Sequence, residues 1–130
     1  MIELKIDLFG NDLNTALEPG VYQIEIRTKS RQKILYIGES VYPLVRCSHH
    51  LYKLKNNPAY WGFTADTIGN SSISLIFSVI ENEIDMQKRK SKEKQLIKER
   101  KPLSQSGASD WLSALRTDIV STWLQSNKKE

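Results

Sequence analysis

The sequence has little of the residue types that make disulfides and zinc sites. Of its 130 residues, one is cysteine and two are histidine. The single cysteine, Cys47, excludes an internal disulfide, and so few cysteine and histidine side chains argue against a structural zinc site. A reducing compartment fits this composition, so we expect a cytoplasmic protein.

Long apolar runs are also missing. No stretch approaches the roughly 20 residues that a membrane-spanning helix needs, so we expect no association with a membrane. The first ten residues, MIELKIDLFG, carry early charges and no small-residue cleavage site, which argues against a secretory signal. No repeat or low-complexity segment is present. The length corresponds to a single domain, 1–130, with a core of about 19–105 and a C-terminal helix within 108–126.

The charge is mildly basic. Lysine and arginine number 19 against 15 acidic residues, which gives a net charge of +4. This balance is compatible with a nucleic-acid partner but does not require one. The cationic residues gather in one segment, and they are Lys88, Arg89, Lys90, Lys92, Lys94, Lys98, Arg100 and Lys101. Such a run is typical of a solvated helix face, and it can also follow a nucleic-acid backbone.

The hydrophobic pattern predicts a small α/β (α+β) domain with a three-stranded, mostly antiparallel sheet flanked by helices. Expected strands are 21–28, 34–38 and 73–80, with a further possible strand at 2–8. Expected helices are 40–55, 82–100 and 110–126. The first two strands form a plausible hairpin. The strand 73–80 is apolar nearly throughout, so we expect it to be central and covered on both faces.

Local signals set the expected ends of the helices. Ser40 can cap the first helix, with Pro43 in its first turn, where a missing N–H does no harm. Pro102 is expected to end the second helix, and SQSGAS, residues 104–109, reads as a linker.

Two sets of aromatic and apolar residues have alternative interpretations. In the last helix Trp111, Leu112, Leu115, Ile119, Trp123 and Leu124 recur at helical spacing. We expect this stripe to pack on the core rather than to form a dimer surface. Between the first helix and the third strand lie Tyr60, Trp61 and Phe63. These rings can stack on nucleobases, although core packing is the expected role of Trp61 and Phe63.

A few polar residues are not explained by a core. Arg46 and His50 are four residues apart, so they share one face of their helix. Glu93 lies on the apolar side of a lysine-rich helix, where an unpaired carboxylate would cost several kcal/mol. It therefore needs a cation, either an arginine or a metal ion. Tyr22 and Tyr36 lie in the two strands of the predicted hairpin, with their hydroxyl groups near the sheet surface.

Together these residue types are suited to phosphodiester hydrolysis. A glutamate can hold one divalent cation, most readily a hydrated Mg²⁺, which neutralises the non-bridging and leaving oxygens. An arginine binds phosphate through two N–H groups. A tyrosine or a histidine can take the proton of an attacking water. Each of these residues alone is more often structural.

The same positions resemble the motifs of the GIY-YIG nuclease family. The tripeptide GVY at 20–22 is similar to the first motif, and YIG at 36–38 is the second. Arg46 follows Tyr36 by ten residues, as the catalytic arginine of the family does, and His50 stands where several members carry a histidine. EKQLIKERKPLSQ at 93–105 looks like the family's E..LIK....P..N segment. The resemblance covers about 19–105, or about two thirds of the chain.

The resemblance implies an endonuclease that hydrolyses DNA phosphodiester bonds with Mg²⁺ or Mn²⁺. Tyr22 would contact or activate the water, and Tyr36 would support the nucleophile or the phosphate. Arg46 would stabilise the transferred charge, His50 would assist proton transfer, and Glu93 would bind the metal. The family fold, a three-stranded antiparallel sheet flanked by helices, agrees with the order of elements above.

Further nucleic-acid contacts are expected from Gly38, Lys53, Lys94, Lys98 and Gln105. Gly38 would also let the chain turn sharply into the helix of Arg46. The preferred substrate is DNA, and RNA is not excluded. Because little chain follows Gln105, we expect weak sequence preference or a recognition partner protein. Cutting a duplex needs two sites or two visits, so a homodimer is a possible arrangement.

Two positions depart from the family pattern. Gln105 stands where the family has asparagine, and Glu39 places a second carboxylate beside the expected site. Glu39 would repel DNA unless it joins the metal or pairs with a cation. These departures motivate an alternative, a catalytically impaired nucleic-acid-binding domain that retains the fold. A third interpretation, a protein-interaction domain, rests on the C-terminal helix with Trp111 and Trp123.

Overall fold

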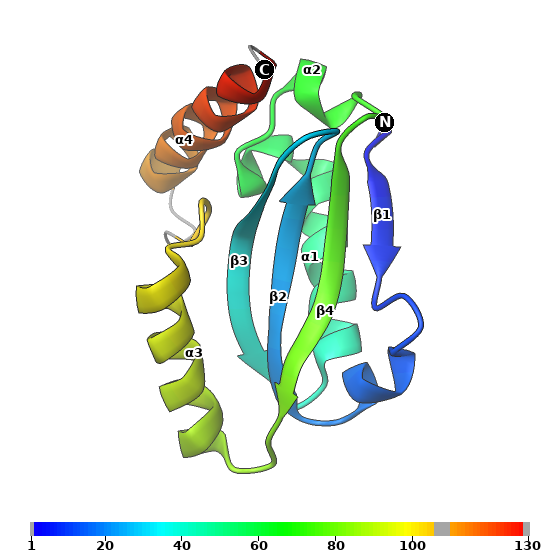
Figure 1. Cartoon of the computed structure of the whole chain (residues 1–130), viewed down its shortest axis with the longest axis vertical. Helices are drawn as coiled ribbons and strands as arrows, with labels where there is room; N and C mark the ends of the chain where they lie inside the picture. The colour runs from blue at the N-terminus through cyan, green and yellow to red at the C-terminus, as the bar shows by residue number, and fades with distance from the viewer. Residues whose placement is uncertain (1, 106–109, 129–130) are drawn as a thin grey trace.

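The structure is a computed structural model, which describes residues 2–105 and 110–128. Its centre is one sheet with the strand order β1-β4-β2-β3 (Figure 1). The strands are β1 (Lys5–Leu8), β2 (Gly20–Arg27), β3 (Gln32–Ser40) and β4 (Ser74–Asn82). The predicted hairpin is confirmed, because β2 pairs antiparallel with β3.

The sheet is mixed, and the prediction of three strands was wrong. β2 is antiparallel to both of its neighbours, whereas β1 runs parallel to β4, with Lys5 opposite Ser74. The possible strand at the N-terminus is therefore a fourth strand at the sheet edge. The fold is α+β with a four-stranded mixed sheet.

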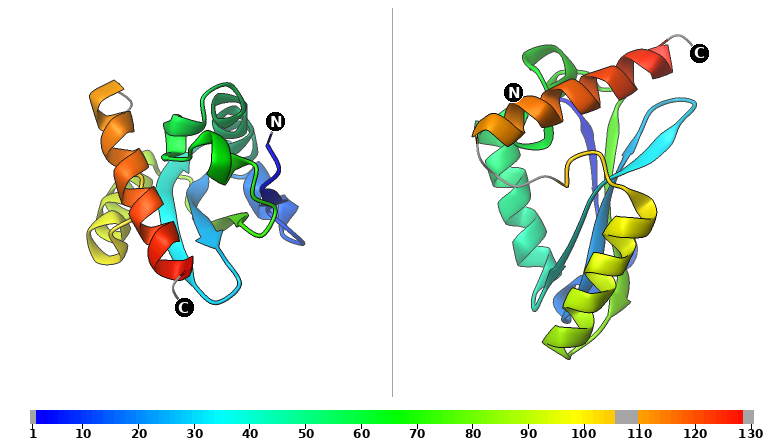
Figure 2. Two further views of the ribbon diagram at one scale, coloured as in Figure 1. Left: turned by 90° about the horizontal axis from the view of Figure 1, so that it is seen from above. Right: turned by 90° about the vertical axis from the view of Figure 1, so that its left-hand side faces the viewer.

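Helices cover both faces of this sheet. The longer ones are α1 (Pro43–Asn56), α3 (Met86–Arg100) and α4 (Asp110–Lys128). Short elements are the 3-10 turns η1 (Leu13–Leu17) and η2 (Pro58–Trp61) and the helix α2 (Ala65–Ile68). Figure 2 shows α1 and α3 on opposite sides of the sheet, with α4 crossing above one end. None of the described helices is long and apolar enough to cross a membrane.

Two hydrophobic cores follow from this layering. Tyr22, Ile24 and Ile26 alternate along β2 and are buried in the larger core on the α1 side, as their spacing predicts. On the other face Val21 and Ile37 pack with Leu96 of α3. The β2–β3 pair, which carries both tyrosine motifs, is therefore buried on both faces.

The strand 73–80 is covered on both faces only in part. Along it Ile73, Leu75 and Phe77 are buried, whereas the residues between them are only partly so. On the second face α3 packs mainly on β3 and β2, and Ile80 of β4 joins the cluster around Leu96. β4 is nevertheless internal in the sheet, between β1 and β2.

The helix starts differ from the predicted ones because the strands are longer. Ser40 is the last residue of β3, so α1 begins at Pro43, and the Ser40 hydroxyl accepts a hydrogen bond from the Tyr42 N–H at 2.9 Å. β4 continues to Asn82, so α3 begins at Met86, capped by Asp85. The predicted linker residues 106–109 and the side chains of Trp111 and Leu112 lie outside what the structure describes.

Candidate active site

The β2–β3 hairpin brings the two motif tyrosines together. Tyr22 is opposite Gly38, and Tyr36 is opposite Ile24, so the two phenols are diagonal neighbours on one face of the sheet. Their ring centroids are 6.3 Å apart. Tyr22 is only 1% exposed, whereas Tyr36 is partly exposed. Tyr36 is therefore nearer to solvent, with Tyr22 behind it.

Gly38 is required by the position of Tyr22. A Cβ atom at residue 38 would lie 2.4 Å from the hydroxyl oxygen of Tyr22 and 2.5 Å from its Cζ. Both distances are far below van der Waals contact, so any side chain here would displace the phenol. The glycine of the YIG tripeptide thus makes room for the tyrosine of the GVY tripeptide. The expectation that Gly38 turns the chain into the helix of Arg46 was wrong, because Gly38 is paired inside β3 and α1 begins only at Pro43. Gly38 is also buried, and its contact with nucleic acid stays a prediction.

His50 connects Tyr22 to the segment after α1. Its Nε2 is 2.8 Å from the Tyr22 hydroxyl, and its Nδ1 is 3.2 Å from the hydroxyl of Tyr60. The imidazole is buried, and burial followed by the charge of Arg46 lowers the pKa of His50 to about 3. At neutral pH the ring is uncharged, so one nitrogen donates and the other accepts.

Arg46 and Tyr22 lie close together at the boundary between core and solvent. Arg46 is exposed on α1, one turn before His50. Burial raises the pKa of Tyr22, and Tyr36 and Cys47 raise it further, while Arg46 acts against them through its charge and a hydrogen bond. The Tyr22 hydroxyl is thus placed between a buried neutral imidazole and an exposed guanidinium.

Glu93 approaches the same cluster from the other face of the sheet. Its carboxyl is partly exposed on α3, and it makes no ion pair with any residue that the structure describes. Burial raises the pKa of Glu93, as does the charge of Glu39, whereas Lys90, the Glu39 backbone amide and Arg46 act in the opposite direction. Burial raises the pKa of Tyr36 as well, followed by the charge of Glu93. The charges of Glu93 and Arg46 therefore both act on the pKa of Tyr36, in opposite directions.

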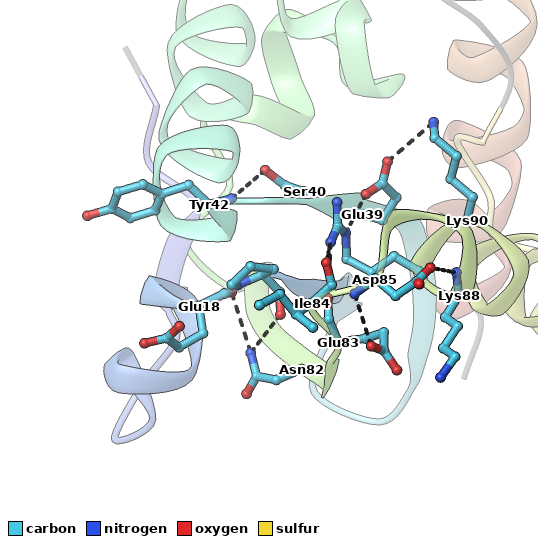
Figure 3. A network of polar contacts seen from close by, with 12 residues as sticks. Glu18, Glu39, Ser40, Tyr42, Asn82, Glu83, Ile84, Asp85, Lys88 and Lys90 are labelled. Atoms are coloured by element: carbon cyan, nitrogen blue, oxygen red, sulfur yellow. Dashed lines mark hydrogen bonds and ion pairs between the residues drawn. The ribbon is translucent and has the colours of Figure 1, made fainter.

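Glu39 is paired with a buried arginine. Arg89 Nε donates to the Glu39 carboxylate at 2.9 Å, and Lys90 Nζ lies 3.5 Å from its other oxygen. Arg89 is 3% exposed and also donates to the carbonyl oxygens of Glu83 and Ile84. Figure 3 shows the polar contacts around Glu39, Glu83 and Ile84. The prediction that the basic segment forms a solvated helix face is therefore wrong for Arg89. This buried side chain connects the end of β3 to the start of α3.

Gln105 binds the edge of β3. Its side-chain oxygen accepts from the Ile37 N–H and its amide nitrogen donates to the Ile37 carbonyl, both at 2.9 Å. Leu103 and Ser104 continue this pairing through their backbone N–H groups, to the carbonyls of Ile34 and Leu35. The Gln105 side chain therefore pairs with the backbone N–H and C=O of Ile37 in the edge strand, as the backbone of a neighbouring strand would. The predicted contact of Gln105 with nucleic acid stays a prediction.

The remaining predicted contact residues lie on the surface. Lys53 is exposed in the last turn of α1, and Lys94 and Lys98 are exposed on α3. Their contact with nucleic acid also stays a prediction. Trp61 and Phe63 are buried, at 2% and 1% exposure, so base stacking by these two rings is excluded and their expected core role is confirmed.

Two further residues belong to the cluster and were missed in the sequence. Tyr60 donates or accepts at His50 Nδ1, and Arg116 of α4 donates from Nη1 to the backbone carbonyl of Tyr60. Tyr60 was noted only as one of three aromatic residues in a loop. Nothing in the local sequence marks Arg116, because its contacts with Tyr60 and Trp61 join residues far apart along the chain.

The binding of Mg²⁺ or Mn²⁺ by Glu93 stays a prediction. Among the described residues no group of three or more His, Cys, Asp or Glu side chains is placed to hold a metal ion. Glu93 offers one partly exposed carboxylate that makes no ion pair with the described residues. Mg²⁺ is commonly bound in this way, through one or two carboxylates, several waters and the substrate phosphate.

No family model, curated protein or solved structure matches the chain. The resemblance to GIY-YIG nucleases therefore rests on the sequence motifs and stays a prediction.

Proposed function

We propose that this chain is a metal-dependent endonuclease that hydrolyses DNA phosphodiester bonds with a GIY-YIG type of site. One observation carries the proposal. Tyr22, Tyr36 and His50, from three separate elements, are joined by ring contacts and a hydrogen bond, and the charges of Arg46 and Glu93 both act on Tyr36. A cluster made only for stability would not need a carboxylate and an arginine at its solvent-exposed side.

Arg46 and Glu93 would handle the phosphate. The exposed guanidinium of Arg46 can bind two phosphate oxygens and stabilise the charge that develops on them. Glu93 would hold Mg²⁺ or Mn²⁺, and the ion would supply further neutralisation of the phosphate and of the leaving oxygen. Pairing of Glu39 with Arg89 leaves Glu93 as the carboxylate that faces the substrate.

Tyr22 and His50 form a proton path away from the phosphate. The Tyr22 hydroxyl can accept the proton of the attacking water while its own proton passes to Nε2 of His50, 2.8 Å away. This direction needs the tautomer in which Nδ1–H donates to the Tyr60 hydroxyl. Burial, and then the charge of Arg46, oppose protonation of His50, and a bound phosphate would offset only the charge of Arg46.

Nicking of a supercoiled plasmid tests the proposal. With Mg²⁺ or Mn²⁺ the wild type is expected to convert plasmid to the nicked circle, and EDTA is expected to stop the reaction. Glu93→Ala and Arg46→Ala should each lower the rate by about 100-fold or more. Glu99→Ala and Lys55→Ala are the matched controls, because they remove exposed charges of the same sign from the same two helices.

The alternative, a nucleic-acid-binding domain without chemistry, gives a different result in the same assay. It predicts salt-dependent DNA binding and no divalent-dependent nicking. No cleavage by the wild type, or equal cleavage by Glu93→Ala, would refute the endonuclease proposal. The pairing of Glu39 with Arg89 weakens one of the two motives for the alternative, because the carboxylate is held by a cation.

A further inference from the structure

Arg116 is a buried arginine of α4 that contacts the η2 turn. It is 4% exposed, and its Nη1 donates to the backbone carbonyl of Tyr60. The guanidinium carbon lies 5.8 Å from the ring centroids of both Tyr60 and Trp61. Cation–π contacts of this kind are stronger when they are desolvated. Arg116 therefore contacts two residues of the η2 turn, Tyr60 and Trp61, at once.

Those two residues enclose His50. The Tyr60 hydroxyl lies 3.2 Å from His50 Nδ1, and the Trp61 ring centroid is 5.0 Å from that of His50. Trp61 also contacts Tyr36 edge-to-face, at 4.6 Å between centroids. Among the described residues Arg116 makes no hydrogen bond to Tyr22 or Tyr36. However, Tyr60 and Trp61, which Arg116 contacts, both contact the imidazole of His50 that is bonded to Tyr22.

The backbone of α4 is fitted closely to this turn. Gly62, directly after η2, has φ of +90°, and a Cβ there would lie 2.5 Å from the Arg116 carbonyl oxygen. Glycine adopts such a conformation without strain and leaves this room. The helix therefore meets the turn at a defined position, with Arg116 directly at the contact.

Burying an arginine side chain costs free energy, because its charge is removed from water. The Nε atom of Arg116 is buried and has no hydrogen-bond partner among the described residues, and burial lowers the pKa of Arg116. Replacing buried ionic groups by apolar residues of similar volume is often neutral or stabilising. An arginine at this place is thus better explained by a task in orienting its neighbours than by stability.

We propose that Arg116 is a positioning residue, which fixes Tyr60 and Trp61 so that His50 keeps one tautomer and presents Nε2 to Tyr22. The proposal rests on the proposed endonuclease function and adds the C-terminal helix to its site. Arg116 acts through Tyr60 and Trp61 and does not touch the substrate. In its absence the imidazole would sample both tautomers, and Tyr22 would lose its proton acceptor for part of the time.

The test combines Arg116→Met, Tyr60→Phe and the control Arg27→Met, whose arginine is half exposed and pairs with Glu25. The imidazole nitrogens of His50 are observed by long-range ¹H–¹⁵N NMR, with His49→Gln used to assign the two histidines. We expect the wild type to show one neutral tautomer with Nδ1 protonated. Arg116→Met and Tyr60→Phe should move both nitrogen shifts towards a mixture, and Arg27→Met should not.

Kinetics supply the second readout. In the nicking assay Arg116→Met and Tyr60→Phe are expected to lower kcat by about 10- to 100-fold with little change in KM, because the substrate contacts remain. A folded Arg116→Met with unchanged His50 signals would overturn the proposal. If Arg116→Met does not fold, unchanged signals in Tyr60→Phe overturn it equally. A wild type without nicking activity refutes the endonuclease function, while the NMR result still decides whether Arg116 orients His50.

Discussion

The hydroxyl group of Tyr22 occupies the space in which a side chain at Gly38 would begin. The two residues are opposite each other in the β2–β3 pairing, and the Cβ position of residue 38 is 2.4 Å from the Tyr22 oxygen. The glycine of one motif and the tyrosine of the other are therefore a single structural unit. This relationship explains why β3 contains a glycine next to its buried Ile37, where a strand would otherwise favour a larger residue.

A substitution at Gly38 should disturb the site before it disturbs the fold. Gly38→Ala is expected to push the Tyr22 phenol away from His50, because the new methyl group overlaps the ring. Overpacking of this kind costs about 1–3 kcal/mol of unfolding free energy. The expected result is a folded protein with reduced stability in urea and loss of nicking activity.

Gly69→Ala is the control for this change. A Cβ at residue 69 would meet its nearest atom at 3.5 Å, which is ordinary contact, and the backbone there is not in the left-handed region. We expect a change within about 0.5 kcal/mol and unaltered activity. Equal effects of Gly38→Ala and Gly69→Ala would contradict the proposed contact between Gly38 and Tyr22.

The two adjacent histidines should differ in their effect on acid stability. His50 has a folded-state pKa of about 3 against about 6.5 in an unfolded chain, so the unfolded state binds more protons below pH 6.5. Its contribution to stability is therefore present above pH 6.5 and is lost as the pH falls towards 3. Between pH 7 and pH 5 the loss should be about 2 kcal/mol.

Urea unfolding at pH 7, 6 and 5 measures this loss. His50→Gln is expected to flatten the dependence in this range, although the variant starts from a lower stability because Tyr22 and Tyr60 lose their partner. His49→Gln, at an exposed position, should keep the wild-type slope. A wild-type slope in His50→Gln would show that the imidazole is not held neutral by burial.

The pair of Glu39 and Arg89 should be worth more than a similar pair on the surface. Glu39→Gln removes the negative charge that pairs with the buried Arg89 guanidinium, which leaves that cation with neutral acceptors only. We expect a loss of about 2–3 kcal/mol in chemical denaturation. Glu25→Gln breaks an ion pair with Arg27, which is half exposed, and should cost less than about 1 kcal/mol. A loss no larger in Glu39→Gln than in Glu25→Gln would refute the structural role of Arg89.

Gln105 should stabilise the edge of β3. Gln105→Leu removes both hydrogen bonds to the Ile37 backbone, and we expect a loss of about 1–3 kcal/mol in unfolding free energy. Gln95→Leu, at an exposed site on α3 with one bond to Glu99, should change it by less than about 0.5 kcal/mol. If Gln105 instead serves only nucleic-acid contact, its substitution would weaken DNA binding without any loss of stability.

Much of the sheet could be predicted because its signals are local. The alternation along residues 21–28 and the short polar turn after them are enough to indicate the β2–β3 hairpin. The pairing of β1 with β4 could not be predicted, since it is parallel and joins segments about 70 residues apart. The start of α1 was misplaced for a related reason, because Ser40 belongs to the strand through its pairing with Gly20.

The site residues were found by spacing, whereas their supporting residues were not. Tyr22, Tyr36 and Arg46 stand in recognisable motifs, so their approach could be expected. Arg89 lies within a run of lysines and is distinguished only by its contact with Glu39, 50 positions away in the chain. Arg116 is likewise identified only by its contacts in the fold. When a single cation of a polar segment is buried, the hydrophobic pattern of the sequence does not show it.

Crystals soaked with Mn²⁺ would test the central claim most directly, through the anomalous signal of the metal. The account predicts a peak roughly 2.1 Å from a carboxylate oxygen of Glu93, on the side that faces Tyr36 and Arg46, with waters as the other ligands. The same peak should vanish in Glu93→Gln. A metal bound elsewhere, or a Glu93 carboxylate paired with a neighbouring lysine or arginine while the metal is present in solution, would contradict it.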